Sequence, residues 1–179
     1  MRATGAVAWL ALSLATATAA TAAPPPLFDV GKTVLLARQV PTNGCHRDVR
    51  PDHRCSPGAI SSGLTKRVIC SGNFRTSAVR NVPQSVKAQL ERAYGLAVRS
   101  YARTLEIDHI VSLELGGSND IANLFPEPGS GPANYHAKDK LENKVHDLVC
   151  AGKLSLRSAQ HAIASDWIAL YRRVFGVAP

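Results

Sequence analysis

The sequence predicts a small α+β domain braced by disulfides. Two short segments rich in β-branched and apolar residues lie at 104–113 and 121–127, and two long amphipathic segments follow at 134–152 and 155–176. Four cysteines allow two disulfides. Once a predicted leader of 22 residues is removed from the 179, 157 residues remain, a length suited to one domain with a hydrophobic core.

The N-terminal segment 1–22 is typical of a secretory signal peptide. Arg2 precedes an apolar run, and the small residues Ala20 and Ala22 mark a cleavage site. The alternative is an uncleaved N-terminal anchor, although the apolar run is shorter than the roughly 20 residues of a membrane span. No later run is long and apolar enough to span a bilayer, so we expect a secreted or periplasmic protein with no membrane partner after cleavage.

The segment 23–54 is predicted to be an extended or loop-like lead-in, because prolines open it and Pro and Gly recur around its cysteines. Within it, 33–40 could form a strand, and 65–70 reads as another strand. We therefore expect the functional domain to occupy 55–179.

A first helix is predicted over 81–95. Asn81 is a plausible N-cap, Pro83 falls in the first turn, and Gly95 ends the helix. Beyond it, 104–113 and 121–127 are expected to be two strands joined by a glycine-containing loop. The helices 134–152 and 155–176 complete the order.

The four cysteines are Cys45, Cys55, Cys70 and Cys150, an even number that predicts two disulfides in an exported chain. Three connectivities are possible. We favour Cys45–Cys55, which closes a short loop, together with Cys70–Cys150, which ties the two halves of the chain. A zinc knot using the histidines of 45–55 is an alternative, but its spacing matches no common zinc-finger pattern.

Charge is unevenly spread along a chain whose net charge is +8. Residues 32–103 hold 13 Lys/Arg against 3 Asp/Glu, whereas 104–179 hold 7 against 9. A basic half beside a slightly acidic half favours a surface that faces a polyanion next to a cation-binding one. The ordinary alternative is a basic charge that serves only solubility.

Candidate catalytic residues gather around the two predicted strands. Cleaving a phosphodiester needs a group that takes a proton from water and a cation that stabilises charge on the phosphate. The imidazole of His109 suits the first role, because the unperturbed pKa of histidine is about 6.5. Asp108 and a helix-borne His, Asn or Asp can hold a divalent ion. The amide of Asn123 can donate and accept at once and so hold the histidine-bearing loop.

The stretch "DHIVSLELGGSNDIANLF", followed by a helix that carries His136, resembles the HNH endonucleases. The resemblance is closest to exported bacterial members with Asp-His, Leu-Gly-Gly and Asn-Leu motifs, and it is strongest over 104–127. It implies a ββα-metal nuclease core with additional helices. In that core His109 would be the general base, Asp108 a metal ligand, and Asn123 the residue that orients the loop.

The last motif position is less well defined. The resemblance implies His136 as the second metal ligand, but His136 comes thirteen residues after Asn123, a wider gap than is usual in the family. Asp139 and Asn143 lie on the same helical face and are alternative ligands. Asp108 and His109 can serve one site only if the strand ends or bulges there, because neighbouring strand residues point to opposite faces.

These patterns predict a secreted, metal-dependent HNH-type endonuclease that cuts DNA, or RNA, with low sequence specificity. Mg²⁺ is the expected ion, with Mn²⁺, Ni²⁺ or Zn²⁺ as alternatives if a histidine is a ligand. Lys138 and Arg80 are expected to contact phosphates. The alternative function is a non-catalytic secreted protein of the same fold that binds nucleic acid or another polyanion.

Overall fold

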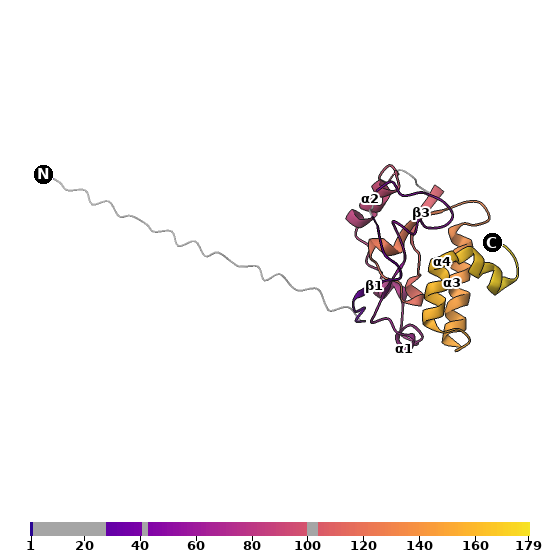
Figure 1. The fold of residues 1–179 in the computed structure, drawn as a ribbon. Coiled ribbons are helices and arrows are strands. Elements are labelled where there is room, and N and C mark those ends of the chain that lie inside the picture. The colour runs from indigo at the N-terminus through magenta and orange to yellow at the C-terminus, as the bar shows by residue number, and fades with distance from the viewer. Residues whose placement is uncertain (2–27, 41–42, 100–103) are drawn as a thin grey trace.

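A computed structural model describes residues 1, 28–40, 43–99 and 104–179 (Figure 1). The predicted signal peptide lies almost wholly outside the described residues. The elements are β1 (Thr33–Leu35), β2 (Ala59–Ser61), α1 (Lys66–Ile69), α2 (Gln84–Ala93), β3 (Leu105–His109), β4 (Leu124–Pro128), α3 (Tyr135–Cys150) and α4 (Leu156–Phe175), with 3₁₀ turns η1 (Thr76–Ala78), η3 (Leu113–Leu115) and η4 (Ile121–Asn123). The α+β class is confirmed, as four helices and two small hairpin sheets within the described part of the chain.

The β3–β4 hairpin holds the centre of the predicted site. The two strands are antiparallel, with Asp108 opposite Phe125 and His109 opposite Leu124. Leu105, Ile107 and His109 are buried, whereas Glu106 is exposed and Asp108 is partly exposed. This alternation is the period of two expected of a strand with one face on the core. β3 ends at His109, as the adjacent Asp-His pair required.

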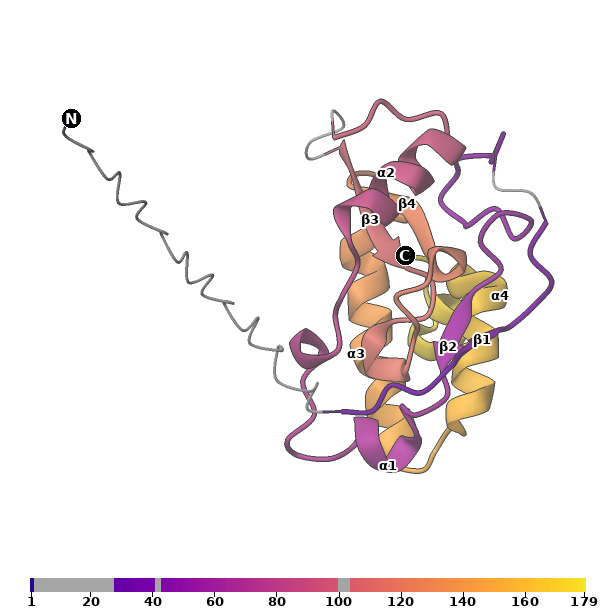
Figure 2. The same cartoon turned by 90° about the vertical axis from the view of Figure 1, so that its left-hand side faces the viewer.

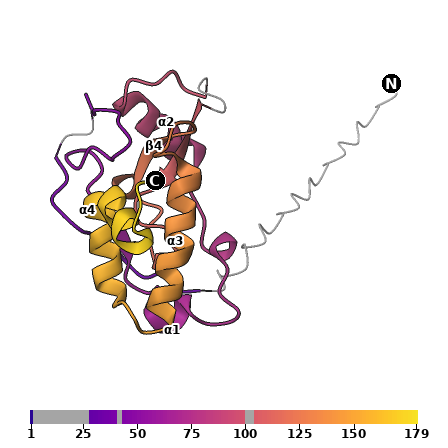
Figure 3. The same ribbon diagram turned by 90° about the vertical axis from the view of Figure 1, so that its right-hand side faces the viewer.

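Helices α3 and α4 lie side by side (Figure 3), and both contact the 3₁₀ turn η3 in the loop that joins β3 to β4. They bury apolar side chains against each other and the rest of the core, among them Leu141, Val145, Ile163 and Trp167. Burying each such side chain contributes roughly 1.5–3 kcal/mol to folding. Among the described residues, none of the helices has the length and apolar character to cross a membrane.

The predicted helix ends are largely confirmed. Asn134 accepts a hydrogen bond from the backbone N–H of Ala137 and caps α3, and Ser155 caps α4 in the same way. A single straight helix over 155–176 is wrong in one respect, because Asp166 has non-helical backbone angles. Its carboxylate accepts hydrogen bonds from two backbone N–H groups that follow it, so an internal N-cap kinks α4.

Three local predictions are corrected. The segment 65–70 is not a strand: the backbone N–H groups of its last residues bond back to Thr65 and Lys66, which forms the short helix α1. α2 begins at Gln84 after Pro83, and the N–H of Asn81 is instead bound by the side chain of Asn119. In the segment 33–40 only the first three residues form a strand. Figure 2 shows α2 and the β3–β4 hairpin at one end of the molecule and α1 at the other.

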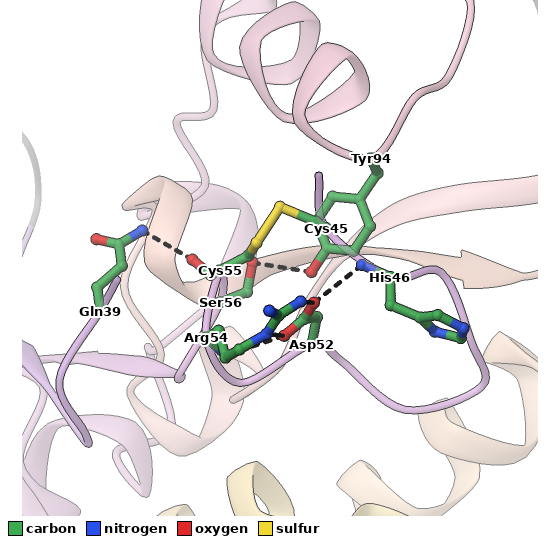
Figure 4. The surroundings of a disulfide bond; sticks show 8 residues. All are labelled: Gln39, Cys45, His46, Asp52, Arg54, Cys55, Ser56 and Tyr94. Carbon is green, nitrogen blue, oxygen red and sulfur yellow. Dashed lines mark hydrogen bonds and ion pairs between the residues drawn. A yellow bond between two sulfur atoms is a disulfide. The ribbon is translucent and has the colours of Figure 1, made fainter. Parts of the chain in front are cut away.

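The favoured disulfide pairing, Cys45–Cys55 with Cys70–Cys150, is confirmed. The zinc knot over 45–55 is therefore wrong in this oxidised form, because both sulfur atoms are joined to each other (Figure 4). The second disulfide joins α1 to the end of α3 across 80 residues of sequence.

Hydrogen bonds and an ion pair hold the lead-in both within itself and against helix α4. Asp52 accepts a hydrogen bond from the His46 backbone N–H and pairs with Arg54 (Figure 4). The Nε1–H of Trp167 in α4 donates to the carbonyl of Val49. Residues on the two sides of the predicted boundary at 55 thus share the same packing.

Candidate active site

A buried ammonium group lies at the junction of β3 and α3. Lys138 is 1% exposed, and its Nζ donates to Asp108 Oδ2 at 2.8 Å, to the carbonyl of His109 at 2.7 Å and to Glu142 Oε1. Glu127 Oε2 is 3.6 Å away. The three donors of the ammonium are therefore all used within a cage of oxygen atoms.

Electrostatics within the cage are governed by burial and by Lys138. Burial would lower the pKa of Lys138, but the surrounding carboxylates outweigh this and raise that pKa well above its usual value. Burial would raise the pKa of Asp108, but the charge and hydrogen bond of Lys138 outweigh burial and lower that pKa. For Glu142 burial prevails and raises the pKa well above the ordinary value.

Three carboxylates beside this cage converge on one point. An oxygen of each of Asp108, Asp139 and Glu142 lies within 4.8 Å of the others. Asp139 is exposed, and burial raises its pKa together with the nearby charge of Asp108. A hollow of about 260 Å³ opens here, and Asp139, Glu142 and Arg80 are among the residues that line it. Hard carboxylate oxygens in such a set are suited to Mg²⁺ or Mn²⁺.

Glu127 on β4 is a buried carboxyl without hydrogen bonds. It is 0% exposed, and neither side-chain oxygen has a hydrogen-bond partner. Burial and the neighbouring charge of Asp108 raise its pKa to about 8, although Lys138 opposes the shift. A buried polar group normally has a partner, so Glu127 is an oxygen ligand that the ammonium of Lys138 leaves unused.

The tautomer of His109 is set by Asn119. Asn119 Nδ2 donates to the carbonyl of Val79 at 2.7 Å, and its Oδ1 accepts from the N–H of Asn81, which fixes the orientation of the amide. His109 Nε2 lies 3.2 Å from the same Oδ1, so Nε2 must be the donor. The neutral imidazole therefore carries its lone pair on Nδ1.

The Nδ1 atom of His109 lies near one of the three carboxylates, that of Asp108. Nδ1 lies 3.9 Å from Asp108 Oδ1 and has no hydrogen-bond partner. The whole residue is only 2% exposed, and it borders a second hollow that Arg80 and Lys87 also line. Asp108 thus lies close both to a proton acceptor and to the other two carboxylates, and Arg80 lines both hollows.

Asn123 holds the loop between the two strands. Its Oδ1 accepts from the N–H groups of Ala59 and Val111, and its Nδ2 donates to the carbonyls of Val111 and Ser118, all between 2.8 and 3.1 Å. Gly117 explains the glycine pair, because a Cβ there would meet the carbonyl oxygen of Val111 at 1.8 Å. Asn123 is fully buried, so its role is to fix the loop rather than to contact substrate.

The structure places His136 and Lys138 differently from the contacts predicted for them. His136 is exposed and stacks on Tyr135, and it is not among the groups that converge with Asp108 in the described structure. Asp139, the alternative that the helical face left open, is among them. Lys138 was expected to contact phosphate, but its ammonium points inward because three oxygen partners hold it there.

Sequence reasoning missed Asn119, Glu127 and Glu142. Asn119 looks like an ordinary turn residue, and only the fold brings it to His109. Glu142 had a usable signal, because Lys138 and Glu142 are spaced i,i+4 on a helix. Glu127 had a weaker one, as an acid at the end of the apolar run "NLFPE".

Comparison with known proteins gives no relative: no family model, no curated protein and no solved structure matches this chain. The resemblance of residues 104–127 to HNH endonucleases therefore stays a prediction, carried by the chain's own residues.

Proposed function

We propose that this chain is a secreted or periplasmic, metal-dependent endonuclease of the HNH type that hydrolyses phosphodiester bonds of DNA, with RNA as an alternative substrate. The observation that carries the proposal is the placement of the His109 Nδ1 lone pair beside Asp108, whose carboxylate also belongs to a convergent set of three. A base and a cation site that share one residue are the two parts that this hydrolysis needs.

Asp108, Asp139 and Glu142 would hold one divalent ion, and their hard oxygen atoms fit Mg²⁺ or Mn²⁺ better than Ni²⁺ or Zn²⁺. The buried carboxyl of Glu127 next to them accepts no hydrogen bond and supplies a further oxygen atom for the ion. When bound, such an ion supplies charge that stabilises the scissile phosphate and the departing oxygen.

The chain's own residues have distinct parts in this proposal. His109 accepts the proton of the attacking water at Nδ1, while Asn119 holds the Nε2 proton and so keeps Nδ1 free. Arg80 and Lys87, at the hollow beside His109, bind the phosphate backbone. Because no base-reading element is visible in the described part of the chain, binding to DNA would rest on phosphates and weaken steeply as salt rises.

One observation favours the alternative, a non-catalytic polyanion-binding protein of the same fold. Nδ1 of His109 is covered in this conformation, and the ammonium of Lys138 already satisfies Asp108 and Glu142. Catalysis therefore requires an opening that lets water reach Nδ1, whereas binding through Arg80 and Lys87 does not.

A plasmid-nicking assay with Mg²⁺ or Mn²⁺ and with chelator separates the two functions. We expect the wild type to nick supercoiled DNA only with the ion. Asp139→Asn should lose most of this activity, and His136→Asn, a matched change one turn earlier on α3, should keep it. DNA binding without nicking by the wild type under every ion condition would favour the non-catalytic protein.

A further inference from the structure

We propose that Lys138 is a built-in competitor of the divalent ion: its ammonium occupies the oxygen cage in the absence of metal and must leave when the ion binds. This inference rests on the proposed metal-dependent function and concerns the regulation of that site. Lys138 would then be a positioning residue that sets how much free metal the protein needs.

The geometry of the ammonium matches that of a small bound cation. Asp108 Oδ2, the carbonyl of His109 and Glu142 Oε1 all bond to Nζ, and Glu127 Oε2 lies at 3.6 Å. Asp108 and Glu142 are also two of the three carboxylates in the convergent set. An ion that takes oxygen atoms from both must share them with Nζ or replace it.

Repulsion makes sharing unfavourable. Two cations held by the same carboxylates lie within a few ångströms of each other beside the buried Glu142, where water screens charge only weakly. The ammonium uses all three of its donors inside the cage, so a small shift does not free its oxygen partners. Displacement of Lys138 is therefore the simpler route to a loaded site.

Glu127 gives an independent sign that the cage holds an oxygen ligand that Lys138 does not use. Its side chain is fully buried, and its Oε2 lies 3.6 Å from Nζ without accepting a hydrogen bond from it. The single ammonium thus leaves one buried carboxyl, that of Glu127, without a hydrogen bond from it. A doubly charged ion could interact with Glu127 as well as with Asp108 and Glu142.

The test is Mn²⁺ binding, followed by the loss of the free-ion signal in electron paramagnetic resonance. Lys138→Met removes the ammonium and keeps the length of the side chain. Lys144→Met removes the same charge from an exposed position of the same helix and controls for net charge. We expect Lys138→Met to bind Mn²⁺ at least ten times more tightly than both the wild type and Lys144→Met.

A measurement of thermal stability keeps the test decisive if Lys138→Met folds poorly. Poor folding is expected because loss of the ammonium leaves the carboxylates around it buried and unpaired. In chelator this variant should unfold at a lower temperature than the wild type, and Mn²⁺ should raise its midpoint more than that of the wild type. Equal or weaker Mn²⁺ binding by Lys138→Met would overturn the proposal, as would a variant that stays unfolded at saturating Mn²⁺.

The nuclease proposal and the competition proposal are contradicted by different results. Tighter Mn²⁺ binding by Lys138→Met together with a wild type that never nicks DNA would support the competition and contradict the nuclease. A wild type that nicks DNA while Lys138→Met binds the ion no more tightly would do the reverse.

Discussion

Replacing Asn123 by alanine tests the structural core of the site. The substitution removes four hydrogen bonds and leaves two backbone N–H groups and two carbonyls without their partner in a buried loop. Each unsatisfied buried group costs about 1–3 kcal/mol, so even the lower value gives a loss of about 4 kcal/mol in the free energy of unfolding. That is a large share of the roughly 5–15 kcal/mol that stabilises a typical domain.

Urea denaturation followed by circular dichroism measures this loss. With a denaturant slope of about 2 kcal/mol per M, the midpoint of Asn123→Ala should fall by about 2 M. Asn73→Ala, a change in an exposed loop, should stay within about 0.5 kcal/mol of the wild type. A loss below about 1 kcal/mol for Asn123→Ala would refute the reasoning, because the four bonds would then contribute little to holding the loop.

Three further predictions concern stability. Gly117→Ala should cost at least about 3 kcal/mol in the same urea titration, since its Cβ meets the backbone of Val111, while Gly72→Ala, with nothing within 4 Å, should be nearly neutral; similar losses would contradict this. The pKa of Asp52 is lowered from 3.8 to about 2, chiefly by its hydrogen bond to Arg54, so its stabilisation is complete above pH 4 and is lost as pH falls through 2. Thermal unfolding should therefore show Asp52→Asn less stable than the wild type at pH 7, with most of that difference gone at pH 2, and a difference as large at pH 2 as at pH 7 would count against the ion pair. Replacing both cysteines of the Cys70–Cys150 disulfide by alanine should cost about 4.5 kcal/mol, against about 2.7 kcal/mol for the other disulfide, because the closed loop is 80 rather than 10 residues long; the opposite order of calorimetric midpoints would disprove the loop-entropy argument.

The elements that periodicity specifies were predictable. The two long helices and the two central strands follow from side-chain spacing and from caps such as Ser155, which act within a few residues of sequence. The segment 65–70 was misassigned because its apolar residues suit a strand, but it has no partner strand and closes a helical turn on Thr65 instead. Likewise, the kink at Asp166 depends on a local cap inside an otherwise continuous pattern.

The candidate site was predictable only in part. Asp108, His109 and Asn123 belong to one short stretch, so their meeting follows from the hairpin. The orientation of His109 depends on Asn119, whose own amide is fixed by Val79, forty residues away in sequence. Sequence spacing does not encode such a contact, because tertiary packing alone creates it.

Lys138 shows the same limit. A lysine on a polar helix is normally expected at the surface, where its charge is hydrated. Here the helix faces three carboxylates from two strands and its own next turn, and their combined charge outweighs the cost of burying the ammonium. The sign of the effect depends on all of these groups together, which no single pattern along the chain reveals.

The most direct test of the central claim is the rate of plasmid nicking by His109→Ala relative to His161→Ala, with Mg²⁺ or Mn²⁺ present and with folding and DNA binding checked in both variants. A general base contributes about 10²–10⁴-fold to a rate. We therefore predict that His109→Ala nicks at least about 100 times more slowly, while His161→Ala, on α4, matches the wild type. Equal nicking by the two folded variants would contradict the assignment of His109 as the base.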